Sequence, residues 1–189
     1  MAEPDRPRVA PLTPAQLDIQ ARELLDLPLK GHEQAEGSDF LLTLVRHPGL
    51  YRRYAPFVGK LLVAGKLPPR DRELAILRGA WLCRADYEWG EHVRIARAAG
   101  LSAEDIESVT VGSQAPGWSG HERAVLQATE QLHACATISD QTWAVLAASY
   151  DELQLIELPI LVGAYQMIAY LQKALAIPLP AGNNGLASR

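Results

Sequence analysis

The chain of 189 residues is 48% hydrophobic and 21% charged, and it carries a formal net charge of −4 at pH 7. These values are typical of a globular domain and exclude wholesale disorder, while the lack of a positive excess argues against a nucleic-acid partner. The length suits one domain with a substantial core.

Capping signals predict helices throughout the first half of the chain. Residues 13–16, Thr-Pro-Ala-Gln, form a capping box with proline at the first helical position, so a helix is expected from there to about Leu27. Ser38 and Pro48 begin the next two predicted helices. The segment 71–83 is apolar on most sides, which predicts a helix at the centre of the fold.

The second half follows the same pattern. Asp86 is a suitable N-cap for a helix over 87–99, and Gly100 is its expected stop. No window shows the alternation typical of a β-strand. We expect an all-α, single-domain bundle of about eight helices over residues 1–180, followed by a flexible tail over 181–189. The remaining N-cap signals are Ser102, Ser119, Ser139 and Ser149, and the last of these helices should end near Ala176.

The cysteines and the apolar segments indicate the compartment. Cys83 and Cys135 are the only cysteines, and two thiols so far apart indicate a reducing compartment rather than a disulfide framework. The N-terminal segment lacks the apolar core of a signal peptide. The run 158–171 is interrupted by proline, glycine and glutamine and is too short to cross a bilayer. We therefore expect a cytoplasmic protein without a membrane partner.

The C-terminal helix predicts self-association. Residues 153–175 have apolar positions on more than one face. A helix that is apolar all round must be covered on all sides, so we expect a homo-oligomer whose interface includes this helix.

The stretch CRADYEWGEH, residues 83–92, concentrates ionisable and aromatic side chains. Glu88 and His92 are four residues apart on one helix face, where the carboxylate could orient the imidazole as a general base or form only a solvated ion pair. Glu73 should face His92, because the short turn after residue 83 favours an antiparallel hairpin. If Glu73 is buried there it needs a partner such as His92; otherwise it only favours the positive end of its helix.

The segment RELAILRGAWLCRADYEWGEHVRIARAAGLSAEDIESV resembles the core of the carboxymuconolactone decarboxylase superfamily, which includes the alkylhydroperoxidase D enzymes. The matching features are the Arg-Glu pair that opens a helix, the aromatic-rich turn, the histidine after it and the GLS-x-x-(D/E)-I that follows. The resemblance covers about Phe40–Val111 and extends more loosely to the final helix. It implies an all-α fold that assembles as trimers or hexamers.

The hydroperoxidase branch of this superfamily has a glutamate followed, after eleven residues, by Cys-x-x-Cys-x-x-x-His. Counted from Glu73, its two cysteines fall on Ala85 and Glu88, and its histidine falls on His92. The chain keeps the glutamate and the histidine but lacks both redox cysteines, and Cys83 lies two positions too early to replace one of them. The resemblance is therefore to a non-redox branch.

The decarboxylase branch also lacks the cysteine pair. It implies an enzyme without metal or organic cofactor that acts by acid/base proton transfer on a small unsaturated carboxylate or lactone, through decarboxylation or isomerisation. The predicted catalytic residues are His92, Glu88 and Glu73. The candidate substrate-binding residues are Arg72, for a carboxylate, one of Tyr87 and Trp89, and Tyr165, where the family's last helix approaches a neighbouring subunit.

Two other functions remain open. An alkylhydroperoxidase-like antioxidant protein would use Cys83 as its nucleophile, and a non-catalytic oligomeric member would keep the fold without the chemistry. Pseudo-enzymes tend to lose buried charge, because an unneeded buried carboxylate is costly. The retention of three ionisable groups therefore favours an enzyme.

Overall fold

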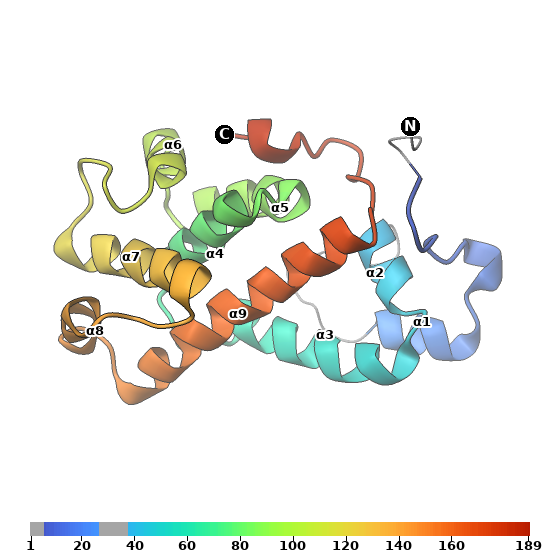
Figure 1. Ribbon diagram of the computed structural model, residues 1–189. Coiled ribbons are helices and arrows are strands. Elements are labelled where there is room, and N and C mark those ends of the chain that lie inside the picture. The colour runs from blue at the N-terminus through green and yellow to red at the C-terminus, as the bar shows by residue number, and fades with distance from the viewer. Residues whose placement is uncertain (1–5, 27–37) are drawn as a thin grey trace. The chain divides into compact units, whose positions relative to one another are not determined.

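The computed structural model describes residues 6–26 and 38–189, and every regular element within them is a helix (Figure 1). The all-α prediction is thereby confirmed. The elements up to residue 65 are η1 (Pro14–Gln16), α1 (Ile19–Leu25), α2 (Asp39–Leu44) and α3 (Pro48–Val63). Those that follow are α4 (Pro69–Cys83), α5 (Asp86–Ala98), α6 (Ala103–Val111), α7 (Gly120–Cys135), α8 (Asp140–Ala147), α9 (Glu152–Ala174) and η3 (Gly185–Ala187).

The described residues form two compact units. The first contains the residues up to Gly65 together with Leu171–Ala181, and the second contains Lys66–Tyr170 and Gly182–Arg189. Helix α9 contributes to both units. The predictions of a single domain over 1–180 and of a flexible tail after it stay predictions. All the candidate site residues lie in the second unit.

Helix α4 is the centre of the second unit, as its apolar sequence predicts. It packs against α5, α6 and α7, and its residues Leu74, Ile76 and Leu77 are at most 1% exposed (Figure 1). Burial of one such side chain contributes roughly 1.5–3 kcal/mol to stability. This packing fixes the position of the N-terminal half of α4, which carries Glu73.

Arg78 joins α4 to helices α6 and α7. Its guanidinium donates to Glu130 Oε1 on α7 at 2.9 Å and to the carbonyl oxygens of Val109 and Thr110 at the end of α6, each at 2.9 Å. The residue is only 8% exposed. Arg78 therefore satisfies the last carbonyl groups of α6, which have no partner within their own helix.

The predicted capping boxes at Ser102 and Ser119 are present at the starts of α6 and α7. The prediction of one continuous helix from residue 13 is wrong. The capping box at Thr13 opens only the three-residue turn η1, because the Asp18 side chain accepts a hydrogen bond from the Ala21 amide at 2.7 Å and begins α1 separately. The predicted helix end at Leu27 lies outside the described residues.

The start of α5 also differs from the prediction by one residue. The N-cap is Ala85, and Asp86 is the first residue of the helix. Asp86 Oδ1 instead accepts a hydrogen bond from the Leu186 amide at 3.2 Å, so its carboxylate binds the C-terminal segment rather than the first turn of α5.

The C-terminal end of the chain lies along α5. The Asn183 side chain donates to the Tyr87 carbonyl at 3.1 Å, and the Trp89 indole donates to the Ser188 carbonyl at 2.9 Å. A Cβ atom at Gly90 would overlap the Asn183 amide, so glycine is what permits this close approach. In the structure this segment covers one face of the helix that carries His92.

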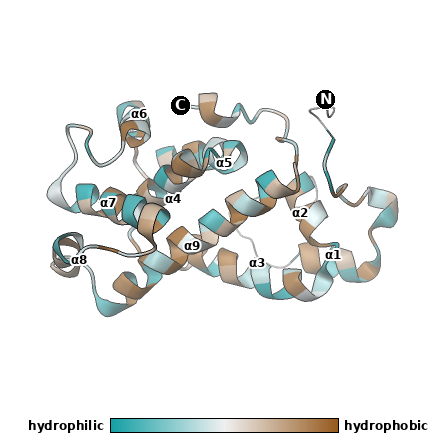
Figure 2. Ribbon diagram, viewed as in Figure 1, coloured by the Kyte–Doolittle hydropathy of each residue, from teal (hydrophilic) through white to brown (hydrophobic). Residues whose placement is uncertain are grey.

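Helix α9 is the longest element, and hydrophobic residues are distributed along it (Figure 2). Its most apolar window of 18 residues has a mean hydropathy of 1.3, enough by length and composition to cross a membrane, and 39% of that window is buried within the structure. Length and composition of this kind also suit a helix that packs against protein. The absence of a membrane partner stays a prediction.

Candidate active site

The α4–α5 hairpin brings Glu73 and His92 into direct contact, as the short turn between the helices predicts. The turn closes through Arg84 in the left-handed conformation, with φ of 51°. Glu73 Oε2 lies 2.7 Å from His92 Nδ1, and the two side chains are 0% and 4% exposed. Because an ionised carboxylate can only accept, Nδ1 carries the proton, and Nε2 is the nitrogen that can take a proton from a substrate.

The second oxygen of Glu73 also has a partner. Arg72 Nε donates to Glu73 Oε1 at 2.8 Å. Burial would raise the pKa of Glu73, but the charge and hydrogen bond of His92, together with those of Arg72, outweigh it and hold that pKa below its ordinary value. Glu73 is therefore an ionised carboxylate held between two cationic or proton-donating side chains.

Arg72 is itself only partly enclosed. Its side chain is 14% exposed, and the bond to Glu73 uses Nε. The two terminal nitrogens lie on the other edge of the planar guanidinium, which is the edge that binds carboxylates in pairs of hydrogen bonds. The structure thus places the predicted carboxylate-binding residue directly beside the Glu73–His92 pair.

Glu88 lies in a different environment from Glu73. It is 2% exposed, and its Oε1 atom is buried without a hydrogen-bond partner among the described residues. Burial raises its pKa well above the ordinary value. The sequence left open whether Glu88 or Glu73 orients the imidazole. In the structure Glu73 contacts His92 directly, whereas burial favours the neutral form of Glu88, one turn earlier on α5.

Tyr165 of α9 contacts the imidazole from another direction. The Tyr165 and His92 rings meet edge to face, with centroids 5.0 Å apart and planes at 86°, and Tyr165 is 5% exposed. The sequence placed Tyr165 only by analogy with the last helix of a family. In the structure its ring contact restricts rotation of the imidazole.

The two aromatic residues of the turn have contacts of different kinds. Trp89 is fully buried, with its ring centroid 5.0 Å from that of Trp81, and its indole is bonded to the C-terminal segment. These are the contacts of a core residue. Tyr87 is half-buried, and its carbonyl accepts from Asn183. The substrate-binding roles of Tyr87 and Trp89 stay predictions.

A second polar cluster was not found from the sequence. Asp71 Oδ2 accepts from the Tyr150 hydroxyl and lies 2.7 Å from each of Tyr150 Oη and His121 Nε2. Burial and the negative charge of Asp71 raise the pKa of Tyr150. The cluster joins the first turn of α4 to α7 and to Tyr150, two residues before α9, so it fixes the end of α4 on which Arg72 and Glu73 lie. Its members are 50 and 79 residues apart, which leaves no local pattern to detect.

Among residues 6–26 and 38–189, no group of three or more His, Cys, Asp or Glu side chains is placed to hold a metal ion. The expectation of chemistry without metal or organic cofactor stays a prediction.

Comparison with known proteins connects this geometry to a family. Residues 48–131 match the model of the carboxymuconolactone decarboxylase family, a span that contains all of α3, α4, α5 and α6. No curated protein matches the chain.

Solved structures share the fold at low sequence identity. An alkylhydroperoxidase AhpD core protein from Ralstonia eutropha JMP134, described as peroxidase-related, has a TM-score of 0.73 at 12% identity, over 92% of this chain and 93% of that one. A peroxidase-related protein from Silicibacter sp. TM1040 has a TM-score of 0.69 at 15% identity, over 85% and 93%. A cysteine-to-alanine variant of the debrominase Bmp8, in complex with 2,3,4-tribromopyrrole, has a TM-score of 0.72 at 20% identity, over 92% and 91%.

Proposed function

Since residues 48–131 belong to the carboxymuconolactone decarboxylase family, we propose that this protein is a cofactor-independent acid/base enzyme. Its substrate is a small unsaturated carboxylate or lactone, on which it moves a proton in a decarboxylation or an isomerisation. The observation that carries the proposal is the series of hydrogen-bonded side chains Arg72–Glu73–His92, in which Glu73 and His92 are buried.

His92 is the proposed base and Glu88 the proposed acid. Glu73 fixes the imidazole with Nδ1 protonated, so Nε2 can remove a proton from a carbon next to a conjugated carbonyl. Burial favours the protonated form of Glu88, and in that form it can return a proton or donate a hydrogen bond to the oxyanion that forms. In an isomerisation the electron pair comes from the C–H bond that His92 breaks, and in a decarboxylation it comes from the bond to the departing CO₂. In both reactions the pair moves into the carbonyl, and the carbon is then reprotonated by His92 or Glu88.

Arg72 is proposed to hold the substrate carboxylate. A guanidinium binds a carboxylate through two parallel hydrogen bonds. While Arg72 Nε donates to Glu73, its two terminal nitrogens can donate to the substrate carboxylate. In a decarboxylation this contact would hold the group that leaves as CO₂. In an isomerisation it would hold a carboxylate that stays.

The alternative functions have less support. The two positions of the redox cysteines are Ala85 and Glu88, so no thiol is available there for hydroperoxide reduction. A purely structural role for the buried charges is disfavoured because burying ions costs free energy, and apolar residues of similar volume stabilise a core as well or better. Small unsaturated rings do enter this fold in one neighbour, the debrominase in complex with 2,3,4-tribromopyrrole.

We also propose that the protein self-associates through α8 and the first half of α9. Five exposed large apolar residues lie on these two helices: Trp143 at 43%, Val145 at 40%, Leu153 at 56%, Ile156 at 59% and Ile160 at 42%. On α9 they recur at helical spacing, which forms one stripe. A second copy of the chain is the partner that the apolar C-terminal helix favours.

The test of function is solvent-deuterium incorporation. A panel of small unsaturated carboxylates and lactones is incubated with the enzyme in deuterium oxide, and deuterium on product carbon is measured by NMR. His92→Ala should lower the rate by roughly 10² to 10⁴, because it removes the base. The control is His47→Asn, which keeps an acceptor at the exposed N-cap of α3 and should retain full activity. Equal rates for His92→Ala and the parent protein would contradict the proposal.

A further inference from the structure

The C-terminal segment binds α5 through a network of hydrogen bonds. Residues 182–189, here called the strap, contain η3 and lie against this helix (Figure 1). Asn183 Nδ2 donates to the Tyr87 carbonyl and to Glu91 Oε1, each at 3.1 Å. Asn183 Oδ1 accepts from the Gly185 amide at 2.8 Å. One side chain therefore both folds the strap and joins it to α5.

Two glycines allow the strap to approach α5 so closely. A Cβ atom at Gly90 would overlap the Asn183 amide, and a Cβ atom at Gly185 would lie 2.6 Å from Asp86 Oδ1. Gly185 also has a positive φ of 54°, which glycine adopts without a steric penalty. A larger residue at either position would displace the strap from the helix.

The strap contacts both helices of the α4–α5 hairpin near its turn. The Arg189 guanidinium carbon lies 5.8 Å from the ring centroids of Trp81 on α4 and Trp89 on α5, within the range of a cation–π contact. The fully buried Trp89 indole donates to the Ser188 carbonyl at 2.9 Å. Arg189 also donates to Glu107 on α6. The strap thus joins three consecutive helices.

The strap and the proposed base lie on different faces of α5. The strap contacts Asp86, Gly90 and Arg97, which share one face because they are four and seven residues apart. Glu88 and His92 each lie two residues further along, roughly half a turn around the helix, and both are buried. Helix α5 is therefore held from one side by the strap, while its other side presents the imidazole to Glu73.

We propose that the strap holds the α4–α5 hairpin closed and thereby keeps His92 in contact with Glu73, so that release of the strap lowers the activity of this site. Arg189 contacts both helices, so the strap helps to set their separation. The 2.7 Å contact between Glu73 Oε2 and His92 Nδ1 depends on that separation. A displacement of about 1 Å would take the two atoms beyond hydrogen-bonding distance. The inference rests on the acid/base function proposed for His92 and makes Asn183 and Arg189 positioning residues.

The strap can detach without unfolding the helices beneath it. Within 182–189, all of which the structure describes, only Gly185 is buried. The strap therefore contributes no large side chain to the core, and its attachment depends on polar contacts that water can replace. Segments held in this way open locally while the rest of a protein stays folded.

Gly90→Ala tests the proposal in the full chain. The added Cβ atom overlaps the Asn183 amide, whereas alanine is the better residue for α5 itself. Amide hydrogen exchange of the C-terminal peptide, measured by mass spectrometry, should become about tenfold faster as the strap detaches. The ¹⁵N chemical shifts of His92 should move from those of one tautomer, with Nδ1 protonated, toward those of a mixture. Turnover should fall about tenfold, because the base is no longer held in one position.

Asn183→Ala distinguishes an effect of the strap from damage to α5. Alone, it removes the hydrogen bonds of the amide and should change the three measurements in the same direction as Gly90→Ala. In the Asn183→Ala background, Gly90→Ala should cause little further change, because the atoms that its Cβ would overlap are absent. Equal effects of Gly90→Ala in both backgrounds would mean that it acts through α5 and would refute the proposal.

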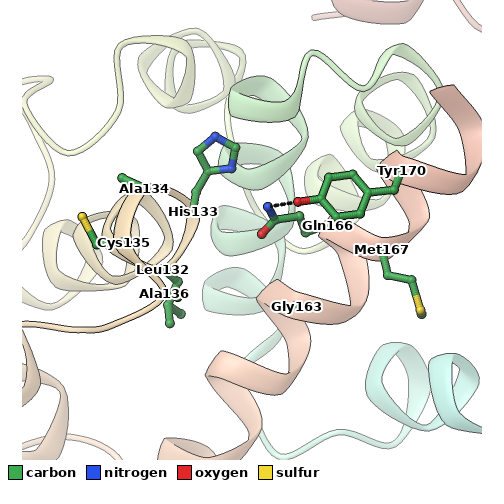
Figure 3. Close-up of a pocket in the computed structure, with 9 residues that line it drawn as sticks. All are labelled: Leu132, His133, Ala134, Cys135, Ala136, Gly163, Gln166, Met167 and Tyr170. Atoms are coloured by element: carbon green, nitrogen blue, oxygen red, sulfur yellow. Dashed lines mark hydrogen bonds between the residues drawn. The ribbon is translucent and has the colours of Figure 1, made fainter. Parts of the chain in front are cut away.

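Gly163→Ala is the matched control for a glycine replaced within a helix. Gly163 lies on α9 beside an open hollow that is also lined by His133 and Met167 (Figure 3). A Cβ atom there would meet nothing within 4 Å, so exchange of the strap, the His92 shifts and turnover should all stay at the parent values.

Two outcomes for Gly90→Ala would overturn the proposal. Exchange of the C-terminal peptide at the parent rate would show that the strap does not depend on the close approach at Gly90. Faster exchange with unchanged His92 shifts would show that the strap does not position the imidazole. Both measurements are made without a substrate, so they are distinct from failure of the proposed function, which full activity of His92→Ala would reveal.

Discussion

His92 Nδ1 on α5 and Glu73 Oε2 on α4 are 2.7 Å apart, in a part of the molecule where neither side chain is more than 4% exposed. An ion pair so far from water is poor evidence for stability, because desolvation of the two groups offsets their attraction. It is better evidence for a fixed tautomer. With the tautomer fixed, the same nitrogen, Nε2, faces the substrate in every turnover, and stereospecific proton transfer requires such a fixed base.

The tautomer can be tested without a substrate. In the parent protein the ¹⁵N chemical shifts of His92 should show Nδ1 protonated when the ring is neutral. Glu73→Gln replaces an acceptor-only group with one that can also donate, so the tautomer preference should weaken. Turnover should fall by about 10² or more if Glu73 positions the base. Glu152→Gln, at the exposed start of α9, should change neither the shifts nor the rate.

Glu88 predicts an unusual dependence of stability on pH. Its folded-state pKa is raised well above the unfolded value, so between these two values the unfolded chain has released a proton that the folded protein keeps. The free energy of unfolding contributed by Glu88 therefore falls as pH rises above about 4.5, the ordinary glutamate value. Glu88→Gln removes this titration, so its thermal midpoint should exceed that of the parent at pH 7 and approach it near pH 4. A parent-to-variant difference that does not change over this range would contradict a neutral Glu88.

Glu73 should show the opposite sign. Its folded-state pKa is lowered, so its contribution to stability is complete above the unfolded value and is lost as pH falls through the folded one. In denaturant titrations, Glu73→Gln should remove part of the acid destabilisation of the parent protein below about pH 4. If the two proteins lose stability in parallel as the pH is lowered, Glu73 does not titrate as the structure implies.

Arg78 should contribute more to stability than an exposed arginine. Arg78→Ala leaves Glu130 without its cation and two carbonyl groups at the end of α6 without their donor. We expect a loss of about 3 kcal/mol in the free energy of unfolding, measured with urea. Arg94→Ala, on the exposed face of α5, should change it by less than about 0.5 kcal/mol.

Ile156 is the most informative residue of the proposed association surface. It is 59% exposed, so Ile156→Glu adds a charge without disturbing the core of the monomer. We expect the parent to have the mass of a trimer or hexamer in light scattering at micromolar concentration, and the variant to have a smaller mass. A monomeric parent over this range would contradict self-association.

The features that the sequence predicts correctly are those whose determining contacts are local. The capping boxes at Ser102 and Ser119 were found because each joins residues three apart. The Glu73–His92 contact could also be predicted, because a short turn fixes the register of two adjacent helices. The division of the first predicted helix into η1 and α1 was missed because Asp18 is a second N-cap only five residues after Thr13.

The contacts that were not predicted from the sequence join segments that are far apart in the chain. Cys83 Sγ lies 3.7 Å from Nδ1 of His133, which is 50 residues away in the sequence, and the same separation hides the contact of Asp71 with His121. The contact of Tyr165 with His92 joins α9 to α5 and was not predicted, while the expected approach of Tyr165 to a neighbouring subunit stays a prediction. Such pairs depend on how α7 and α9 pack against the hairpin, which hydrophobic periodicity does not specify.

The two indoles of Trp81 and Trp89, whose centroids are 5.0 Å apart at an interplanar angle of 55°, are close enough for their electronic transitions to couple. Coupled indoles produce a paired positive and negative band in near-ultraviolet circular dichroism, whereas Trp118 and Trp143 contribute as separate chromophores. Trp81 lies on α4 and Trp89 on α5, so the paired band should be observed only while the two helices remain closed on one another. The protein thus contains an optical probe of the helical hairpin that carries Glu73 and His92, and binding at that hairpin can be followed without an added label.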